Sequence, residues 1–126
     1  MGLTNRTLVF GQRIYDWLST FGTVYRGVLP SGVEPDTAYM LISGSSANFG
    51  EKMQFPVMIY QRGTSSIAGV LNIVQSLENA IGEGGLLKIY NNIRFKVDKG
   101  SPWYQDAQTG EEMVKGGVVN LEITIY

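Results

Sequence analysis

Acidic side chains are the first residues of this sequence whose types could do chemistry. Between positions 98 and 112 the chain carries Asp98, Asp106, Glu111 and Glu112. Carboxylate oxygens are the ligands that Ca²⁺ and Mg²⁺ prefer, and two carboxyl groups facing one substrate can perform acid–base catalysis. The spacing fits no EF-hand loop, and it indicates no such facing pair. We therefore expect no metal, no cofactor and no catalytic residue in this stretch.

The segment 63–66, Gly-Thr-Ser-Ser, lies between a predicted strand and a predicted helix. Free backbone N–H groups at the start of a helix can bind an anion. The glycine spacing and the lysine of a phosphate-binding loop are both missing here. The segment is therefore interpreted as a helix cap.

Basic side chains recur around a predicted hairpin, at Lys88, Arg94, Lys96 and Lys99. A surface that binds nucleic acid usually interleaves basic and aromatic side chains on one face. Phe95 is a neighbouring aromatic residue, but strand alternation places it on the apolar side. A solvated sheet face or a contact with another protein is the favoured interpretation.

The Pro102-Trp103-Tyr104 segment places two large aromatic side chains in a stretch with no helical or strand period. Trp and Tyr are frequent anchors of protein interfaces. Alternatively, the segment folds back so that Trp103 fills an edge of the core. Both interpretations stay open from the sequence.

Composition excludes several classes of chemistry. The 126 residues include no Cys and no His, which removes disulfides, thiol nucleophiles and the commonest general base. Ten basic and eleven acidic residues give a net charge of −1, so no overall field draws the chain to DNA or to an anionic membrane. The apolar runs are too short for a membrane span. At 44% hydrophobic residues, the chain is expected to form one domain, 1–126, with a conventional core.

Apolar periodicity predicts a first helix over about residues 4–21. Thr4 or Asn5 could cap its start, and Gly22 could end it. The side chains that share one face at a period of 3.6 are Phe10, Ile14, Trp17, Leu18 and Phe21.

A second helix is predicted over residues 67–81, with Gly82 at a left-handed C-terminal cap. Its apolar face comprises Ile67, Val70, Leu71, Val74, Leu77 and Ile81.

Six segments have the composition or alternation of strands: 23–29, 38–43, 53–60, 86–90, 93–97 and 118–126. Pro56 cannot donate to a strand ladder, so its strand should lie at an edge or carry a bulge. Asn91-Asn92 fits a tight hairpin, because Asn tolerates positive φ. Helices and strands do not strictly alternate along the chain. The prediction is therefore an α+β fold, with a mainly antiparallel sheet of about five to six strands and two helices packed on one face.

Three polar stretches are predicted as long loops, at 31–37, 44–52 and 99–117. Loops longer than about 12–15 residues in a compact domain are usually functional or disordered. The last of the three is long enough to qualify.

The chain resembles the tail-terminator and minor-capsid (tail-completion) proteins of long-tailed bacteriophages. The resemblance covers nearly the whole chain and lies in its size, the order of its segments and its general sequence character. No single motif in it is diagnostic. It is carried by the opening helix with Ile14, Trp17 and Leu18, the segments 24–30, 39–42 and 59–63, the capped helix to Leu77, Pro102, and the closing segment 120–126.

This resemblance implies a structural protein of the virion, assembled in the host cytoplasm, and not an enzyme. Such proteins form a ring, typically hexameric, on the head-proximal end of the tail tube. The ring ends tube polymerisation and offers the surface that joins the head. The implied partners are further copies of the chain, the tail-tube protein and the head-completion or connector protein, while DNA only passes through the lumen and no membrane is involved.

Interface residues are expected in the three polar loops, because a ring needs two different patches on each subunit. A head-completion or neck protein, a tail-tube subunit, and a small ligand- or metal-binding module are the alternative functions. The expected interface residues are Glu34, Asp36, Glu51, Lys52, Trp103, Tyr104, Asp106, Glu111 and Glu112.

Overall fold

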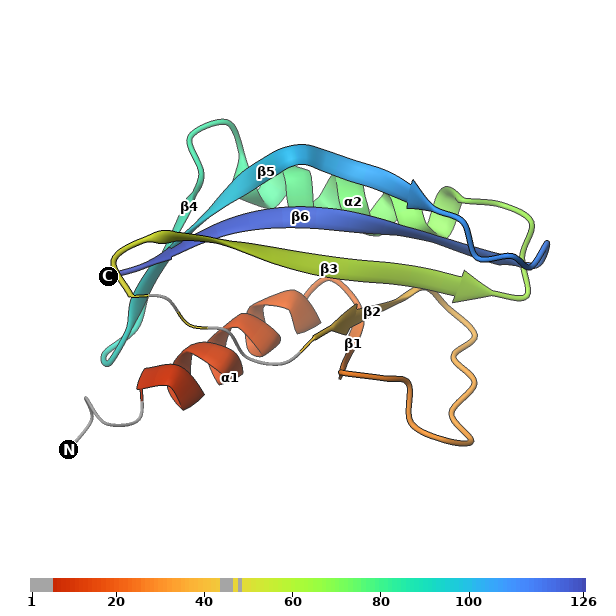
Figure 1. Ribbon diagram of the computed structural model, residues 1–126, viewed down its shortest axis with the longest axis horizontal. Helices are drawn as coiled ribbons and strands as arrows, with labels where there is room; N and C mark the ends of the chain where they lie inside the picture. Colours follow the sequence, from red (N-terminus) through yellow and green to blue (C-terminus); the bar gives the residue numbers. More distant parts are fainter. Residues whose placement is uncertain (1–5, 44–46, 48) are drawn as a thin grey trace.

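The first predicted helix forms where the apolar periodicity places it. In the computed structural model, which describes residues 6–43, 47 and 49–126, α1 is Arg6–Ser19 (Figure 1). Phe21 lies beyond the helix end and is only half-buried. Thr4 and Asn5, the expected caps, lie outside the described residues. The predicted apolar face is confirmed, since α1 buries Phe10, Ile14, Trp17 and Leu18.

The second helix, α2, is Ala68–Ile81, close to its predicted bounds. Gly82 ends it with a φ of 69° and donates its N–H to the Glu78 carbonyl oxygen. The positive φ agrees with the prediction, but a ψ of −176° lies outside the left-handed helical conformation that was expected of this cap. At the other end, the N-cap position is Ile67, which makes no side-chain cap hydrogen bond, and the Ser66 hydroxyl before it accepts the N–H of Ala68 at 3.1 Å. Leu71 was assigned to the apolar face, but it is 40% exposed.

The six strands form one sheet in the order β1-β2-β3-β6-β5-β4. Neighbouring strands are antiparallel except β1 and β2, which are parallel. The fold is therefore α+β with a mostly antiparallel, curled sheet, as the sequence predicted. The strands are β1 (Thr23–Arg26), β2 (Tyr39–Ile42), β3 (Lys52–Arg62), β4 (Leu86–Ile89), β5 (Arg94–Ala107) and β6 (Val114–Ile125).

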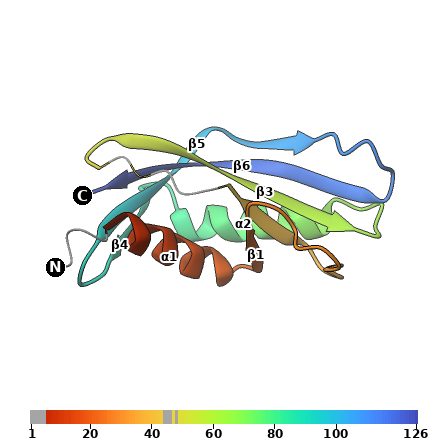
Figure 2. The ribbon, with the colours of Figure 1, turned by 60° about the horizontal axis from the view of Figure 1, so that its bottom comes forward.

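β6 is the centre of the sheet and pairs with β3 on one side and β5 on the other. Alternate side chains of these strands are buried on the face that the helices cover. Phe10 of α1 reaches this face and packs edge-to-face on Phe55 and Phe95, with ring centroids 6.3 and 5.3 Å away. Figure 2 shows both helices on the same side of the sheet, so the other face stays open.

The prediction of a long loop over 99–117 is wrong. β5 continues to Ala107 and β6 already begins at Val114, so only 108–113 connect them. The register shifts between Lys99 and Tyr104, where the chain forms a bulge, and the Asn120 side chain donates to the Pro102 carbonyl oxygen across it at 2.8 Å. The bulge breaks the two-residue alternation that identifies a strand in the sequence.

The expectation for the strand of Pro56, an edge position or a bulge, is wrong, and that for Asn91-Asn92 is met only in part. β3 is interior to the sheet, with β2 on one side and β6 on the other. The pairing with β2 ends at Val57, so Pro56 lies just past it. The N–H that proline lacks therefore breaks no described hydrogen bond to β2. The hairpin between β4 and β5 forms where Asn91-Asn92 predicted it, with the Tyr90 N–H donating to the Ile93 carbonyl at 2.9 Å. Positive φ is found only at glycines among the described residues, so the asparagines do not use the left-handed conformation.

The core makes a direct prediction at Phe10. Because Phe10 is fully buried between two further aromatic rings, Phe10→Ala should lower the free energy of unfolding by about 3–5 kcal/mol. Leu8 on the same helix is 75% exposed, so Leu8→Ala should change it by less than about 0.5 kcal/mol. Urea denaturation followed by circular dichroism measures both, and equal losses would contradict the packing described.

Candidate protein interface

Trp103 and Tyr104 are strand residues of β5, not loop residues as the sequence predicted. Tyr104 pairs opposite buried Val119, so it lies on the helix-covered face of the sheet. Both aromatic side chains are half-buried and pack against the core. The indole N–H of Trp103 is buried and has no hydrogen-bond partner among the described residues. This placement favours the interpretation that Trp103 fills an edge of the core.

Two adjacent glycines of β6 make room for aromatic rings on the two faces of the sheet. A Cβ at Gly116 would collide with the Tyr60 ring, and a Cβ at Gly117 would collide with the Tyr104 ring. Successive strand residues point to opposite faces, so the rings close over β6 from both sides. Glycine is therefore required here for close approach.

Asp106 accepts a hydrogen bond from the Tyr104 hydroxyl at 2.7 Å. Burial of the phenol raises the pKa of Tyr104 well above its usual value, and the hydrogen bond to the Asp106 carboxylate and its charge raise it further. Asp106 itself is exposed. The pair therefore fixes the end of β5, with the neutral phenol as donor.

The end of the sheet where β3 finishes and β6 begins brings together two of the predicted interface residues from distant parts of the sequence. Glu34 and Glu111 both act on Arg62, the last residue of β3. The hydrogen bond from Arg62 to Tyr39 is the main cause that raises the pKa of Arg62, and the two carboxylates add to it. The segment after β1 and the turn between β5 and β6 therefore meet at this end.

A groove of about 460 Å³ opens at the same end. Its apolar wall includes Val28, which is 77% exposed, and its polar side includes Arg62 and Glu111. The described residues that line it are Val28, Leu29, Tyr39, Leu41, Tyr60, Arg62, Gln108, Thr109, Glu111 and Val114. We call these residues, with the neighbouring Glu34, the acidic groove.

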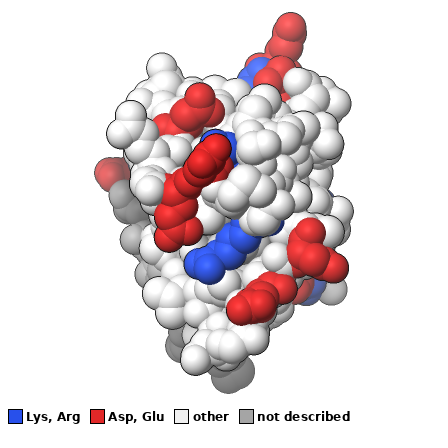
Figure 3. Space-filling view, turned by 90° about the vertical axis from the view of Figure 1, so that its right-hand side faces the viewer, with Lys and Arg blue, Asp and Glu red and all other residues white. Residues whose placement is uncertain are grey.

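Acidic side chains predominate around the acidic groove, as Figure 3 shows for this end of the molecule. Asp36 and Glu112 are exposed in the two connections that meet here, and Asp106 is exposed near the end of β5. Arg62 and Lys115 are the cations of the strand ends beside them. The end as a whole carries more negative than positive charge.

Glu51 and Lys52, two further predicted interface residues, lie at the end of the sheet opposite to the acidic groove. Lys52 is the first residue of β3 and pairs opposite Thr124, near the end of β6. Its ammonium group lies 3.8 Å from the carboxylate of Glu122. The expected interface residues are therefore divided among three places: the two ends of the sheet, and β5, where Tyr104 lies on the helix-covered face.

The end of the sheet that holds Lys52, opposite to the acidic groove, also carries a basic surface, which the sequence predicted only in part. The Arg13 guanidinium stacks 4.4 Å from the centre of the Tyr90 ring, and the Lys88 ammonium lies 5.9 Å from it. Arg6 donates to the backbone oxygen of Tyr126. Arg6, Tyr90 and Arg94 line a hollow of about 480 Å³, and none of its described lining residues is acidic. Arg6 and Arg13 come from α1, far from the hairpin in sequence, so strand spacing gave no sign of them.

β4 forms one edge of the sheet and exposes apolar side chains there. Leu87 is 51% exposed and Ile89 is 66% exposed. The register pairs Ile89 with Arg94 and Leu87 with Lys96, so these four side chains share the open face of the sheet. Lys88 pairs opposite buried Phe95 and therefore lies on the helix-covered side, as does Arg13 of α1. We call the surface that wraps around this edge the basic edge: Leu87, Ile89 and Arg94 on the open face, with Arg6, Arg13 and Lys88 around Tyr90.

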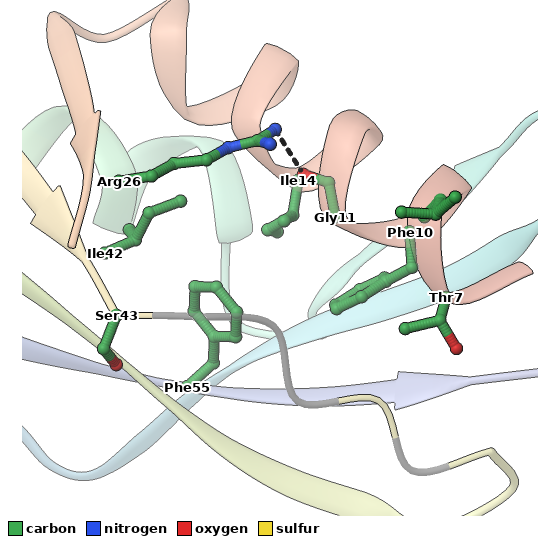
Figure 4. A pocket seen from close by; sticks show the side chains of 9 residues that line it. Thr7, Phe10, Gly11, Ile14, Arg26, Ile42, Ser43 and Phe55 are labelled. Atoms are coloured by element: carbon green, nitrogen blue, oxygen red, sulfur yellow. Dashed lines mark hydrogen bonds between the residues drawn. The ribbon is translucent and has the colours of Figure 1, made fainter.

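A smaller hollow of about 170 Å³ lies between α1 and the sheet (Figure 4). Phe10, Ile14, Ile42 and Phe55 face it, and Arg26 reaches across to donate to the Gly11 carbonyl at 3.2 Å. Pockets that hold small molecules usually measure about 300–1,000 Å³. The small volume therefore makes this hollow a weak candidate for a ligand site.

Residues 6–43, 47 and 49–126 contain no group of three or more acidic side chains arranged to hold a metal ion. No helix in this part of the chain is long and apolar enough to span a bilayer. No family model, curated protein or solved structure matches the sequence or the fold. The acidic groove and the basic edge therefore stand on their own geometry as the candidate interfaces.

Alkaline pH tests the Tyr104–Asp106 contact. The pKa of Tyr104 is raised in the folded protein, so its stabilising contribution is complete below the unfolded value of about 10 and is lost as the pH rises above it. Tyr104→Phe should therefore lose less stability than the wild type between about pH 10 and pH 11.5. Urea denaturation across this range measures the difference, with the open-face variant Tyr60→Phe as control. Parallel pH profiles for wild type and Tyr104→Phe would contradict the assignment.

Proposed function

We propose that this chain is a structural protein of a bacteriophage virion that forms a ring, typically hexameric, on the head-proximal end of the tail tube. The ring ends tube polymerisation and provides the surface on which the head is joined. The proposed partners are other copies of the chain, the tail-tube protein and a head-completion or connector protein. DNA passes through the lumen without being gripped.

The observation that carries this proposal is the exposed apolar edge strand β4. A free edge presents unpaired backbone N–H and C=O groups, and natural proteins usually protect it with charge or a covering segment. Here the four-residue edge strand carries Lys88 as its one charge, and Leu87 and Ile89 on either side of it are exposed. Such an edge is a surface on which a second polypeptide can add.

The remaining surface is compatible with a ring. A ring is built from heterologous contacts, in which two different patches of each subunit meet. The acidic groove and the basic edge are two such patches, at the two ends of one sheet. The net charge of −1 also keeps the repulsion between neighbouring copies small.

Growth of tail tubes tests the proposal. Light scattering follows polymerisation of the tail-tube protein of the same phage, with and without this chain. Tubes should stop at a finite length in its presence, and the chain should sediment with them. Continued growth with the chain left monomeric would remove the terminator function, and incorporation along the whole tube would identify a tube subunit instead.

Substitution of the edge strand gives the residue-level prediction. Burying each of these two side chains contributes at least about 1.5 kcal/mol, so Leu87→Lys with Ile89→Lys should weaken self-association roughly 100-fold. Sedimentation velocity over a concentration series measures this. Leu71→Lys is the matched control, because Leu71 is also exposed but lies on α2, and it should associate like the wild type. Unchanged association of the β4 variant would contradict the role of the edge.

A further inference from the structure

We propose that the joint between neighbouring subunits is formed by the basic edge of one copy docked in the acidic groove of the next. This inference rests on the proposed ring and names the two surfaces that close it. The occupant of the acidic groove is then a second copy of this chain.

Charge complementarity is the first argument. Arg6, Arg13, Lys88 and Arg94 surround the hairpin between β4 and β5, where no described residue lining the hollow is acidic. At the far end, Glu111 lines the acidic groove and Glu34 acts on the same arginine, Arg62. Complementary potentials of this kind steer association and fix its register. The cations of the basic edge can therefore pair with the carboxylates of the acidic groove on another copy of the same chain.

The apolar parts of the two surfaces also match in kind. The basic edge projects Leu87 and Ile89 beside Arg94 on one face. The acidic groove offers Val28, Leu29 and Leu41 as an apolar wall, with Glu111 on its polar side. Interfaces commonly combine an apolar centre with a polar rim. Docking would cover the exposed apolar side chains of both surfaces in one contact.

The geometry of the sheet makes the contact head-to-tail. Arg94 begins β5 and lies at the end of the sheet where β6 finishes, whereas Arg62 ends β3 beside Val114, where β6 begins. A copy docked at one end therefore leaves its own opposite surface free for the next copy. Repetition of such a contact gives a closed ring when the rotation between copies closes.

Two variants with one damaged surface each provide the test. Ile89→Glu damages the basic edge, and Glu111→Lys with Glu112→Lys damages the acidic groove. Each variant alone should lose assembly and sediment as a monomer of 13.9 kDa. An equimolar mixture retains one intact pair of surfaces, so it should form at least a heterodimer of about twice the 13.9 kDa mass.

Controls separate docking from folding. Leu71→Glu matches the apolar substitution, and Asp16→Lys matches the charge reversal on the exposed side of α1. Both should assemble like the wild type. Thermal melting of each monomer should stay close to that of the wild type, since Ile89, Glu111 and Glu112 are all exposed. Arg94→Glu replaces Ile89→Glu as the variant of the basic edge if that change lowers the melting temperature.

The outcomes distinguish this inference from the proposed function. If the wild type forms rings and either variant alone does so too, the assigned joint is wrong but the ring remains. A mixture that stays monomeric shows that the two surfaces do not meet each other, and it points to the tail-tube protein as the occupant of one of them. A wild type that never assembles, alone or on tubes, overturns both.

Discussion

The paired length of β6 is the constraint on which the rest of the structure depends. This strand is hydrogen-bonded to β3 from Val114 to Thr124 and to β5 on its other side. An interior strand paired on both sides holds its neighbours at a fixed spacing and twist. The two ends of this central ladder are therefore set at a defined separation, and whatever the connections carry at each end is held there.

The helices complete this arrangement from one side only. α1 and α2 fill the face of the sheet that carries Phe55 and Phe95, with Phe10 wedged between these two rings. The short strands β1 and β4 are left as edges. Surfaces for a partner are consequently found at the edges and ends of the sheet, where the acidic groove and the basic edge lie.

Much of the fold could be predicted from the sequence, because both helices and most strands have a clear period. The faces of α1 and α2 follow the 3.6-residue spacing, with Leu71 as the misassigned position. The second half of β5 could not be predicted, since the bulge between Lys99 and Tyr104 interrupts the alternation that identifies a strand. A local pattern cannot reveal this pairing, because it depends on residues of β6 that lie 9 to 15 positions further along the chain.

The candidate surfaces were predictable only in fragments for a related reason. Glu34 and Glu111 were both expected at an interface, but their meeting at Arg62 depends on how β1, β3 and β6 are arranged. Arg13 was not expected at all, because it reaches Tyr90 only through the packing of α1 against the hairpin. The sequence indicates which side chains are available for contacts, and the tertiary fold decides which of them become neighbours.

Electron microscopy of negatively stained tail tubes incubated with this protein tests the central claim most directly. The account predicts one closed ring of copies at a single end of each tube, with bare tube walls. Tubes with no added density at either end, beside a protein that remains monomeric, would contradict it.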